Sequence, residues 1–301
     1  MAATRCRSRP FIYRVDPCTL CNLKCACCVG RGFDTSEQRM MALGDFVHII
    51  RAIESYAVRV SLYDEGEPLM NKDLYRMITY ASKKKISTLI STNFNLFRTA
   101  DVEQLFGSGL SVLEPCLDGF QQDTYEQYRR GGDVETVKAG IREVASFKRR
   151  HQQQWPFIDV QVILFDHVKR EIPLLIQFLE ECNVDRITLR KEILGYSAVD
   201  DRVLPSRMLE APKPRRCYWL YLGMMVRPDG NVYPCCGRGF NRFPYGNILR
   251  QELWEIWNNR YYRFSRALFS PGPALELTKD LENVPCLSCE CFTKSRTVLN
   301  A

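Results

Sequence analysis

The sequence CTLCNLKCACC, residues 18–28, holds five of the fourteen cysteines of this 301-residue chain. Disulfides, zinc and an iron–sulfur cluster are the three ordinary uses of so many thiols in one loop. The N-terminal segment MAATRCRSRP lacks the apolar stretch of a signal peptide, so we expect a cytoplasmic protein. In a reducing cytoplasm, clustered cysteines bind metal or do redox work more often than they form disulfides.

Three cysteines of this loop, Cys21, Cys25 and Cys28, form a C-x3-C-x2-C pattern. Three thiolates on one loop can hold three irons of a [4Fe–4S] cube, which leaves the fourth iron open to a ligand other than protein. A structural zinc site takes four closed ligands instead, and Cys18 or Cys27 would supply the fourth. The loop alone therefore favours an iron–sulfur cluster without excluding zinc.

Strand-like and helix-like stretches alternate around and beyond this loop. Short runs rich in β-branched and aromatic residues predict strands, and apolar residues at helical spacing predict helices. We expect strands at 11–15, 58–63, 86–91, 110–117, 157–165 and 185–190, and helices at 43–56, 71–82, 100–107, 134–148 and 170–182. Asn71 and Asp133 are expected N-caps, and Pro173 fits a first helical turn. The repeats predict an α/β fold with a parallel sheet, either open or a partial barrel.

Polar segments follow the ends of the first four predicted strands. They are the cysteine loop, DEGEP at 64–68, STN at 91–93 and CLDG at 116–119. In barrels of this type the loops at the carboxyl ends of the strands build the active site. We therefore expect these segments to form one shared site.

This order of motifs resembles the radical S-adenosylmethionine superfamily. The resemblance covers about residues 11–195 and rests on the three cysteines, on Gly66-Glu67-Pro68, on Ser91-Thr92-Asn93 and on LDG at 117–119. It implies a partial (β/α)6 TIM-like barrel whose [4Fe–4S] cluster, bound by Cys21, Cys25 and Cys28, chelates S-adenosylmethionine. It also implies reductive cleavage of that cofactor to a 5′-deoxyadenosyl radical, with the protein aligning the reactants and excluding water.

The resemblance assigns further positions to the cofactor. It implies that Gly66, Glu67 and Pro68 hold the methionine amino group. It implies that Ser91 and Asn93 reach the ribose or carboxylate.

Arg129, in the segment YRRGGD, resembles a family position near the cofactor carboxylate. Two positions depart from the family pattern. Glu65 replaces the first glycine of a double glycine, and Cys27 replaces a bulky apolar residue. The first change is modest if the turn contacts the cofactor through its backbone.

A second group of cysteines lies in the last third of the chain. A hairpin with Pro228-Asp229-Gly230 as its turn and a C-x2-C pair form a four-ligand set, as in a zinc ribbon or an iron–sulfur site. The layout is similar to the auxiliary-cluster domains of radical S-adenosylmethionine enzymes, and more to the short twitch form than to the seven-cysteine SPASM form. This resemblance implies an auxiliary [4Fe–4S] cluster bound by Cys217, Cys235, Cys286 and Cys289, with Cys236 and Cys291 as alternates.

The chain thus divides into three expected parts. Residues 1–200 form the core barrel, 201–216 a proline-rich linker, and 217–301 the cysteine-rich twitch/SPASM-like domain of a hairpin plus helix. The amphipathic stretch 251–264 is expected to be one helix of the last part.

Several reactions fit a barrel with an auxiliary cluster. The resemblance to enzymes of the 2-deoxy-scyllo-inosamine dehydrogenase type implies oxidation of a small hydroxylated metabolite, a sugar or cyclitol, with the auxiliary cluster accepting an electron. Radical epimerisation is an alternative, in which Cys116 returns a hydrogen atom. Peptide modification is another, and about ten residues before the first strand would make it depend on a separate partner protein. Arg190 is a candidate for binding a substrate hydroxyl or anion.

An alternative from another class is a zinc-binding structural or interaction protein. It would account for the cysteines but not for the polar segments at successive strand ends. The net charge of +7 comes from scattered basic residues, and no nucleic-acid motif is present. No run of about 18 apolar residues predicts a membrane span. We expect a small-molecule substrate and an electron donor such as flavodoxin or ferredoxin, without nucleic acid or membrane as partners.

Overall fold

The computed structural model describes residues 4–26, 28, 39–191, 217–235, 243–270, 278–287 and 289. The predicted linker 201–216 and the alternate cysteines Cys27, Cys236 and Cys291 lie outside these residues. Within the described part no helix is long and apolar enough to cross a membrane.

Six parallel strands form the larger part of the sheet, in sequence order from one edge. They are β1 (Ile12–Val15), β2 (Arg59–Ser61), β3 (Ser87–Thr92), β4 (Val112–Pro115), β5 (Phe157–Leu164) and β6 (Arg186–Lys191). Each lies within three residues of its predicted bounds at either end. The predicted parallel sheet of β–α repeats is confirmed.

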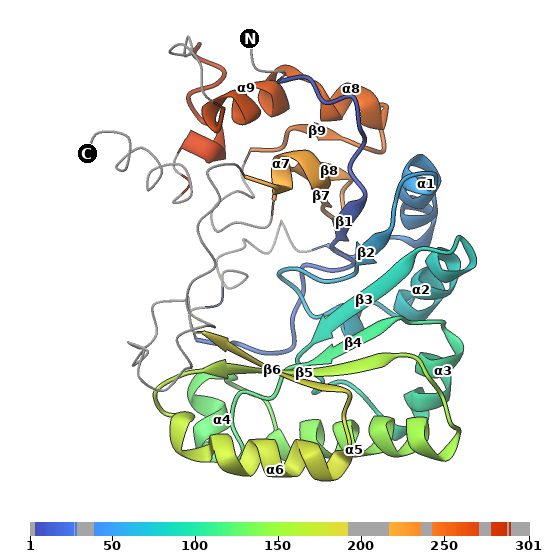
Figure 1. Cartoon of the computed structure of the whole chain (residues 1–301), viewed down its shortest axis with the longest axis vertical. Helices are drawn as coiled ribbons and strands as arrows, with labels where there is room; N and C mark the ends of the chain where they lie inside the picture. The colour runs from blue at the N-terminus through green and yellow to red at the C-terminus, as the bar shows by residue number, and fades with distance from the viewer. Residues whose placement is uncertain are drawn as a thin grey trace.

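Helices line the outer side of this curved sheet (Figure 1). They are α1 (Leu43–Ile53), α2 (Leu74–Lys83), α3 (Val102–Gly107), α4 (Gln122–Tyr128), α5 (Val134–Arg150) and α6 (Ile172–Cys182). Their apolar stripes bury Phe46, Met77 and Ile141, among others, against the sheet in one core. Burial of these stripes is the main force that holds the layers together.

One helix, α4, was not predicted. Its sequence, QDTYEQY, buries only two side chains, Tyr125 and Tyr128, so its apolar periodicity is too short to be recognised. Tertiary contacts of the two tyrosines, rather than local pattern, hold this helix of about two turns in place.

The expected caps differ in outcome. The side chain of Asp133 accepts a hydrogen bond from the Glu135 amide and caps α5, and Pro173 lies in the first turn of α6, both as predicted. The prediction for Asn71 was wrong about the cap position, because α2 begins at Leu74 with Asp73 as its N-cap, although the side-chain oxygen of Asn71 accepts from the Asp73 amide at 2.9 Å. The Asn71 side-chain amide donates to the carbonyls of Pro17 and Met41, at 2.8 and 3.0 Å, and ties the second strand's loop to the first.

The last third of the chain extends the same sheet. β7 (Gly223–Val226) pairs in parallel with the free side of β1, and β8 (Asn231–Tyr233) and β9 (Gly246–Asn247) follow antiparallel, which gives the strand order β6-β5-β4-β3-β2-β1-β7-β8-β9 among the described residues. The predicted hairpin with its turn at 228–230 is confirmed. The segment before it forms a short helix, α7 (Trp219–Leu222), rather than strand.

The single helix predicted at 251–264 was wrong. Two helices occupy this stretch, α8 (Leu253–Trp257) and α9 (Arg260–Leu268). The side chain of Asn259 accepts hydrogen bonds from the amides of Tyr261 and Tyr262 and so starts a new helix. Asparagine favours this role because its short side chain competes for backbone donors.

The sheet face opposite the helices carries polar side chains. Residues paired in register point to the same side, and alternate residues of a strand point to opposite sides. On β4, Leu113 lies in the core, so Glu114 and the following Cys116 point away from it. We call this side the inner face, and its polar members include Arg14, Ser61, Ser91, Glu114, Cys116, Asp159, Gln161, Arg186, Thr188 and Arg190.

Candidate active site at the strand ends

The cysteine loop leaves the carboxyl end of β1 and is fixed by backbone hydrogen bonds. The amide of Lys24 donates to the carbonyl of Arg130 at 2.9 Å, and the amide of Ala26 donates to the carbonyl of Tyr128 at 2.8 Å. These bonds join the loop to the end of α4. The unpredicted helix therefore has a role in positioning the thiols.

The three motif thiols lie within reach of one another's charge. Burial, followed by the nearby Glu67, Cys25 and Cys28, raises the pKa of Cys21 to about 11, with one backbone hydrogen bond opposing. Among the described residues no three His, Cys, Asp or Glu side chains surround a point that would hold a single metal ion. Three thiols on one loop are the ligand set that a [4Fe–4S] cluster takes from the protein when its fourth iron binds another group.

Gly66 lies directly against the cysteine loop. A Cβ atom at this position would sit 1.9 Å from the carbonyl oxygen of Cys18 and 2.6 Å from that of Leu20. The Glu67 amide donates to the Leu20 carbonyl at 2.7 Å, and Pro68 starts a short 3-10 turn. Only glycine allows the turn and the loop to touch.

The carboxylate of Glu67 joins this turn to β3. One oxygen accepts from the Thr92 hydroxyl at 2.5 Å and from the Leu69 amide at 3.0 Å, and the other accepts from the Asn93 amide at 2.8 Å. The side chain is 2% exposed, and burial raises its pKa. Three donors stabilise this buried carboxylate, and they commit it to holding the two strand ends together.

Asn93 and Ser91 point to different neighbours. The amide nitrogen of Asn93 donates to the side-chain oxygen of Asn22 at 2.9 Å and lies 3.8 Å from the sulfur of Cys21. The hydroxyl of Ser91 lies 3.7 Å from the sulfur of Cys116. Asn93 thus belongs with the cysteine loop, and Ser91 belongs with the inner face.

Arg129 is fixed by a buried carboxylate. Its Nε and Nη2 atoms lie 2.7 and 2.6 Å from the same oxygen of Asp118, whose other oxygen accepts from the Ile163 amide at 2.6 Å. The remaining guanidinium nitrogen lies 3.9 Å from the sulfur of Cys25. Burial raises the pKa of Cys25 and Arg129 opposes this most, so the guanidinium favours the thiolate. Asp118 was missed as a functional residue, although it lies in the quoted CLDG segment.

Cys116 and Arg190 lie further along the sheet. Cys116 is half-buried, and burial raises the pKa of its thiol to about 11, with Arg129 as the main opposing charge. The Nε atom of Arg190 donates to the side-chain oxygen of Gln161 at 2.6 Å. Its guanidinium also lowers the otherwise raised pKa of Glu114. Cys116 adjoins Arg129 and Ser91, whereas the partners found for Arg190 among the described residues are Gln161 and Glu114.

The second cysteine group gathers beside the C-terminal hairpin. Burial, to which Cys217 and Cys289 add, raises the pKa of Cys286 to about 11. The charges of Cys235 and Cys286 both raise the pKa of Tyr262, so both thiols lie near this residue. The structure thus places the four predicted thiols in one neighbourhood, which fits the predicted ligand set.

Two hydroxyl groups face Cys286 from the protein side. The Tyr245 hydroxyl lies 3.6 Å from its sulfur and 2.6 Å from the hydroxyl of Ser265, and all three residues are buried. Both hydroxyls lower the thiol's pKa. Donors of this kind stabilise a thiolate ligand and tune the group it binds.

A buried ion cluster lies where β1, β2 and β7 meet, next to the first cysteine loop. Arg227, which follows β7, lies 3.3 Å from Asp16 and 2.6 Å from Glu65, and Arg14 lies 3.1 Å from Asp64. These residues come from the ends of β1, β2 and β7. The sequence pattern gave no sign of it, because its members come from three strand ends, and Arg227 lies more than 150 residues from each of the others.

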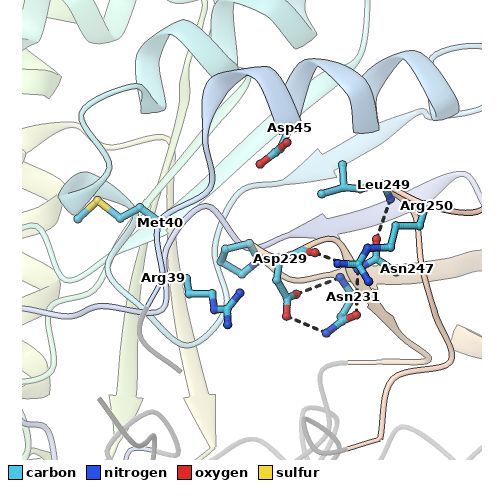
Figure 2. A pocket seen from close by; sticks show the side chains of 9 residues that line it. Arg39, Met40, Asp45, Asp229, Asn231, Asn247, Leu249 and Arg250 are labelled. Carbon is cyan, nitrogen blue, oxygen red and sulfur yellow. Dashed lines mark hydrogen bonds between the residues drawn. The ribbon is translucent and has the colours of Figure 1, made fainter. Parts of the chain in front are cut away.

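A pocket of about 490 Å³ opens beside Arg39 and Met40, which follow the cysteine loop in the sequence (Figure 2). Its polar groups bond largely to one another: Asp229 accepts from both the amide and the side chain of Asn231. None of the predicted site residues lines it. The lining consists of Arg39, Met40, Asp45, Pro228, Asp229, Asn231, Asn247, Leu249 and Arg250.

Solved structures show where else this fold occurs. Streptococcus suis SuiB bound to S-adenosylmethionine superposes with a TM-score of 0.72 at 20% identity, over 95% of this chain and 72% of SuiB. BtrN in complex with AdoMet and 2-DOIA superposes with a TM-score of 0.54 at 17% identity, over 87% of each chain. At these identities the likeness shows the fold.

Curated relatives match only part of the chain. A probable GTP 3′,8-cyclase of Methanococcus maripaludis is 27% identical over 131 residues, which is 44% of each chain. The chain therefore spans less than half the length of that relative.

Family models cover both parts of the molecule. A model described as an iron–sulfur cluster-binding domain, SPASM, matches residues 217–290, and the model of the Radical SAM superfamily matches residues 15–188, more than half of the chain. With this match the chain belongs to the radical S-adenosylmethionine superfamily, and its cofactors are S-adenosylmethionine, the [4Fe–4S] cluster that binds it, and auxiliary iron–sulfur.

Proposed function

We propose that this enzyme oxidises a small hydroxylated metabolite, a sugar or cyclitol, and passes an electron to an auxiliary [4Fe–4S] cluster. The observation that carries the proposal is the pairing of β1 with β7. It places the strand that leads into the first cysteine loop against the hairpin that Cys217 precedes and Cys235 follows, with the loop at the carboxyl end of β1 and these two thiols toward its amino end. An electron acceptor on the same sheet as the radical site is what oxidation needs and hydrogen-atom return does not.

The residues present fit the proposed cofactors. Cys21, Cys25 and Cys28 would hold the first cluster, and Cys217, Cys235, Cys286 and Cys289 the auxiliary one. S-adenosylmethionine, cleaved reductively at the first cluster, supplies the 5′-deoxyadenosyl radical that abstracts a hydrogen atom. This assignment leaves the chain's own side chains to bind, orient and exclude water.

The turn at 66–68 acts through its main chain in this proposal. Glu67 is supported in a structural role by its three donors, so the methionine amino group would meet backbone carbonyls. Arg129 would meet the methionine carboxylate while it stabilises Cys25. Asn93, beside Cys21, would reach the ribose or carboxylate, and Ser91 would join it from the inner face.

We extend the proposal to a small-molecule substrate, an electron donor such as flavodoxin or ferredoxin, and a cytoplasmic setting. Residues 1–200, 201–216 and 217–301 remain our proposed division of the chain.

Epimerisation is the second candidate, and Cys116 is the observation in its favour. A hydrogen-atom donor must carry its hydrogen, and a pKa of about 11 keeps this thiol protonated at neutral pH. Replacing Cys116 with serine separates the two reactions. Oxidation should survive C116S, whereas epimerisation should stop.

Variants of the two cysteine groups test the proposal. We expect Cys21, Cys25 and Cys28 changed together to alanine to abolish 5′-deoxyadenosine formation in anaerobically reconstituted enzyme. We expect Cys286 and Cys289 changed to alanine to leave that formation largely intact but to stop oxidation, because the electron then lacks its acceptor. Oxidation that persists without both tail cysteines would contradict the electron-acceptor role.

A further inference from the structure

Two buried polar atoms on the inner face make no hydrogen bond of standard geometry to any described residue. They are Oε2 of Glu114 and Nε2 of Gln161. The residues are 6% and 7% exposed. A buried donor or acceptor without a partner costs free energy, and such groups often mark a place where a ligand supplies the missing bond.

Sheet register places these two residues beside the proposed radical site. Glu114 pairs with Ser91 across β4 and β3, and Cys116 forms a bridge to Gln161 across β4 and β5. Glu114 and Cys116 are two positions apart on one strand, so they share a face and lie about 7 Å apart along it. The charge of Arg129 lowers the pKa of Cys116, and the same guanidinium contacts the sulfur of Cys25.

The side-chain oxygen of Gln161 already has a partner in the structure. Gln161 Oε1 accepts from Arg190 Nε at 2.6 Å, which orients its amide nitrogen away from Arg190. The Gln161 amide nitrogen also interacts with the Glu114 carboxylate as a hydrogen-bond donor, although not in standard geometry, and so lowers the pKa of Glu114. Because an amide nitrogen carries two hydrogens and a carboxylate oxygen accepts more than one bond, the pair still offers a ligand one donor and one acceptor on neighbouring strands.

An alcohol can bond to both the donor of Gln161 and the acceptor of Glu114. Its hydroxyl can accept from Gln161 and donate to Glu114 at the same time, as hydroxyl groups are both donors and acceptors. An ammonium group could satisfy only Glu114, and a carboxylate could satisfy only Gln161 and would be repelled by Glu114. The pair is therefore selective for a hydroxyl among common substrate groups.

We propose, resting on the function proposed above, that Glu114 and Gln161 bind the hydroxyl on the carbon that is oxidised, and that Glu114 accepts its proton. The carbon's hydrogen atom goes to the 5′-deoxyadenosyl radical, the hydroxyl proton to Glu114, and the remaining electron to the auxiliary cluster. The C–H and O–H bonds break and a C=O bond forms. The alcohol becomes a ketone or aldehyde.

The charges around Glu114 suit a proton acceptor. Burial raises its pKa, and Asp159 adds to this, while Arg190, the Gln161 amide and Arg186 oppose. A carboxylate whose proton affinity is raised toward neutrality is a better base than an exposed one. Arg190 then serves as a positioning residue, because it acts on the substrate through Gln161.

The test uses anaerobically reconstituted enzyme with S-adenosylmethionine and four named probes: scyllo-inositol, myo-inositol, D-glucose and 2-deoxy-scyllo-inosamine. Binding is followed by saturation-transfer NMR, oxidation by mass spectrometry, and radical formation by 5′-deoxyadenosine release. The variants are E114Q, which keeps the shape of the side chain, and Q161L. The control is E103Q on the exposed side of α3.

We expect E114Q to lower ketone formation by about 100-fold, the loss typical of removing a general base, while 5′-deoxyadenosine release stays near wild type. We expect Q161L to weaken probe binding, and wild-type oxidation to rise with pH in a way that E114Q does not share. Oxidation by E114Q equal to that of E103Q would overturn this inference and leave the proposed function standing. A wild-type enzyme that releases 5′-deoxyadenosine but neither binds nor oxidises any probe would overturn both.

Discussion

At the scale of single residues, the site depends on a few positions where no other side chain fits. Gly66 is the sharpest example, because its Cα lies where two carbonyl oxygens of the cysteine loop leave no space for a Cβ. The sequence pattern pointed to this turn, since glycine before Glu-Pro is a turn signal. It could not show the contact with Cys18, which depends on how two strand ends meet.

We expect Gly66→Ala to prevent stable cluster assembly. The new methyl group would meet the carbonyl oxygen of Cys18 at 1.9 Å, and both partners are backbone, so the loop itself would have to move. The measurement is iron content after anaerobic reconstitution, together with 5′-deoxyadenosine release. We expect both to fall by at least about tenfold, as a displaced ligand loop would cause.

Gly44→Ala is the matched control for this change. Gly44 lies in α1, and a Cβ there would meet nothing within 4 Å. Alanine in a helix is more favourable than glycine by about 0.5–1 kcal/mol, so this variant should be slightly more stable and fully active. Equal iron content in the two variants would show that the close approach at Gly66 does not matter to the cluster.

At the scale of elements, the strands were predictable and the C-terminal helices were not. Helices cover one side of strands such as β5. The residues on that side must be apolar, so the strand is rich in β-branched residues and can be recognised in the sequence. The stretch 251–264 has apolar residues at helical spacing throughout, so periodicity predicts one helix. The side chain of Asn259 breaks it, because one side-chain oxygen satisfies two backbone amides.

Replacing Asn259 with alanine should destabilise the protein by about 1 kcal/mol, the usual value of an N-cap. The cap starts α9, which carries Tyr262 and Ser265 beside the second cysteine group. The measurement is the free energy of unfolding from denaturant titration. Asn259→Asp keeps an oxygen for the two amides but loses the bond from Nδ2 to the Tyr245 carbonyl. If Asn259→Ala and Asn259→Asp lower the free energy of unfolding by the same amount, the cap is not what stabilises α9.

At the scale of the whole molecule, the decisive feature is that the cysteine-rich C-terminal part continues the barrel sheet. The sequence identified both cysteine groups and the hairpin between them. It could not show that β7 pairs with β1, because a pairing across some two hundred residues leaves no local pattern. The ion cluster at this junction was missed for the same reason, and so was the Glu114–Gln161 pair, whose members come from separate strands.

The ion cluster makes a prediction about how the two parts of the sheet hold together. Arg227 is 5% exposed and lies against Asp16 and Glu65. Replacing it with methionine removes this cation from buried carboxylates, which typically costs about 3–5 kcal/mol. We expect Arg227→Met to lower the free energy of unfolding by that amount near neutral pH, and Arg263→Met, on the exposed side of α9, to change it little.

The pH dependence of this loss separates charge from packing. Burial already raises the pKa of Asp16, and Arg227 opposes the rise, so the variant should raise it further. A carboxyl with a raised folded-state pKa destabilises the fold as pH increases through that pKa, and the penalty disappears where it is protonated both folded and unfolded. The cost of Arg227→Met, measured by denaturant titration at matched ionic strength, should therefore shrink as pH is lowered from about 8 toward about 5. A cost that stays constant over this range would mean that Arg227 joins the two parts of the sheet by packing of its side chain rather than by its charge.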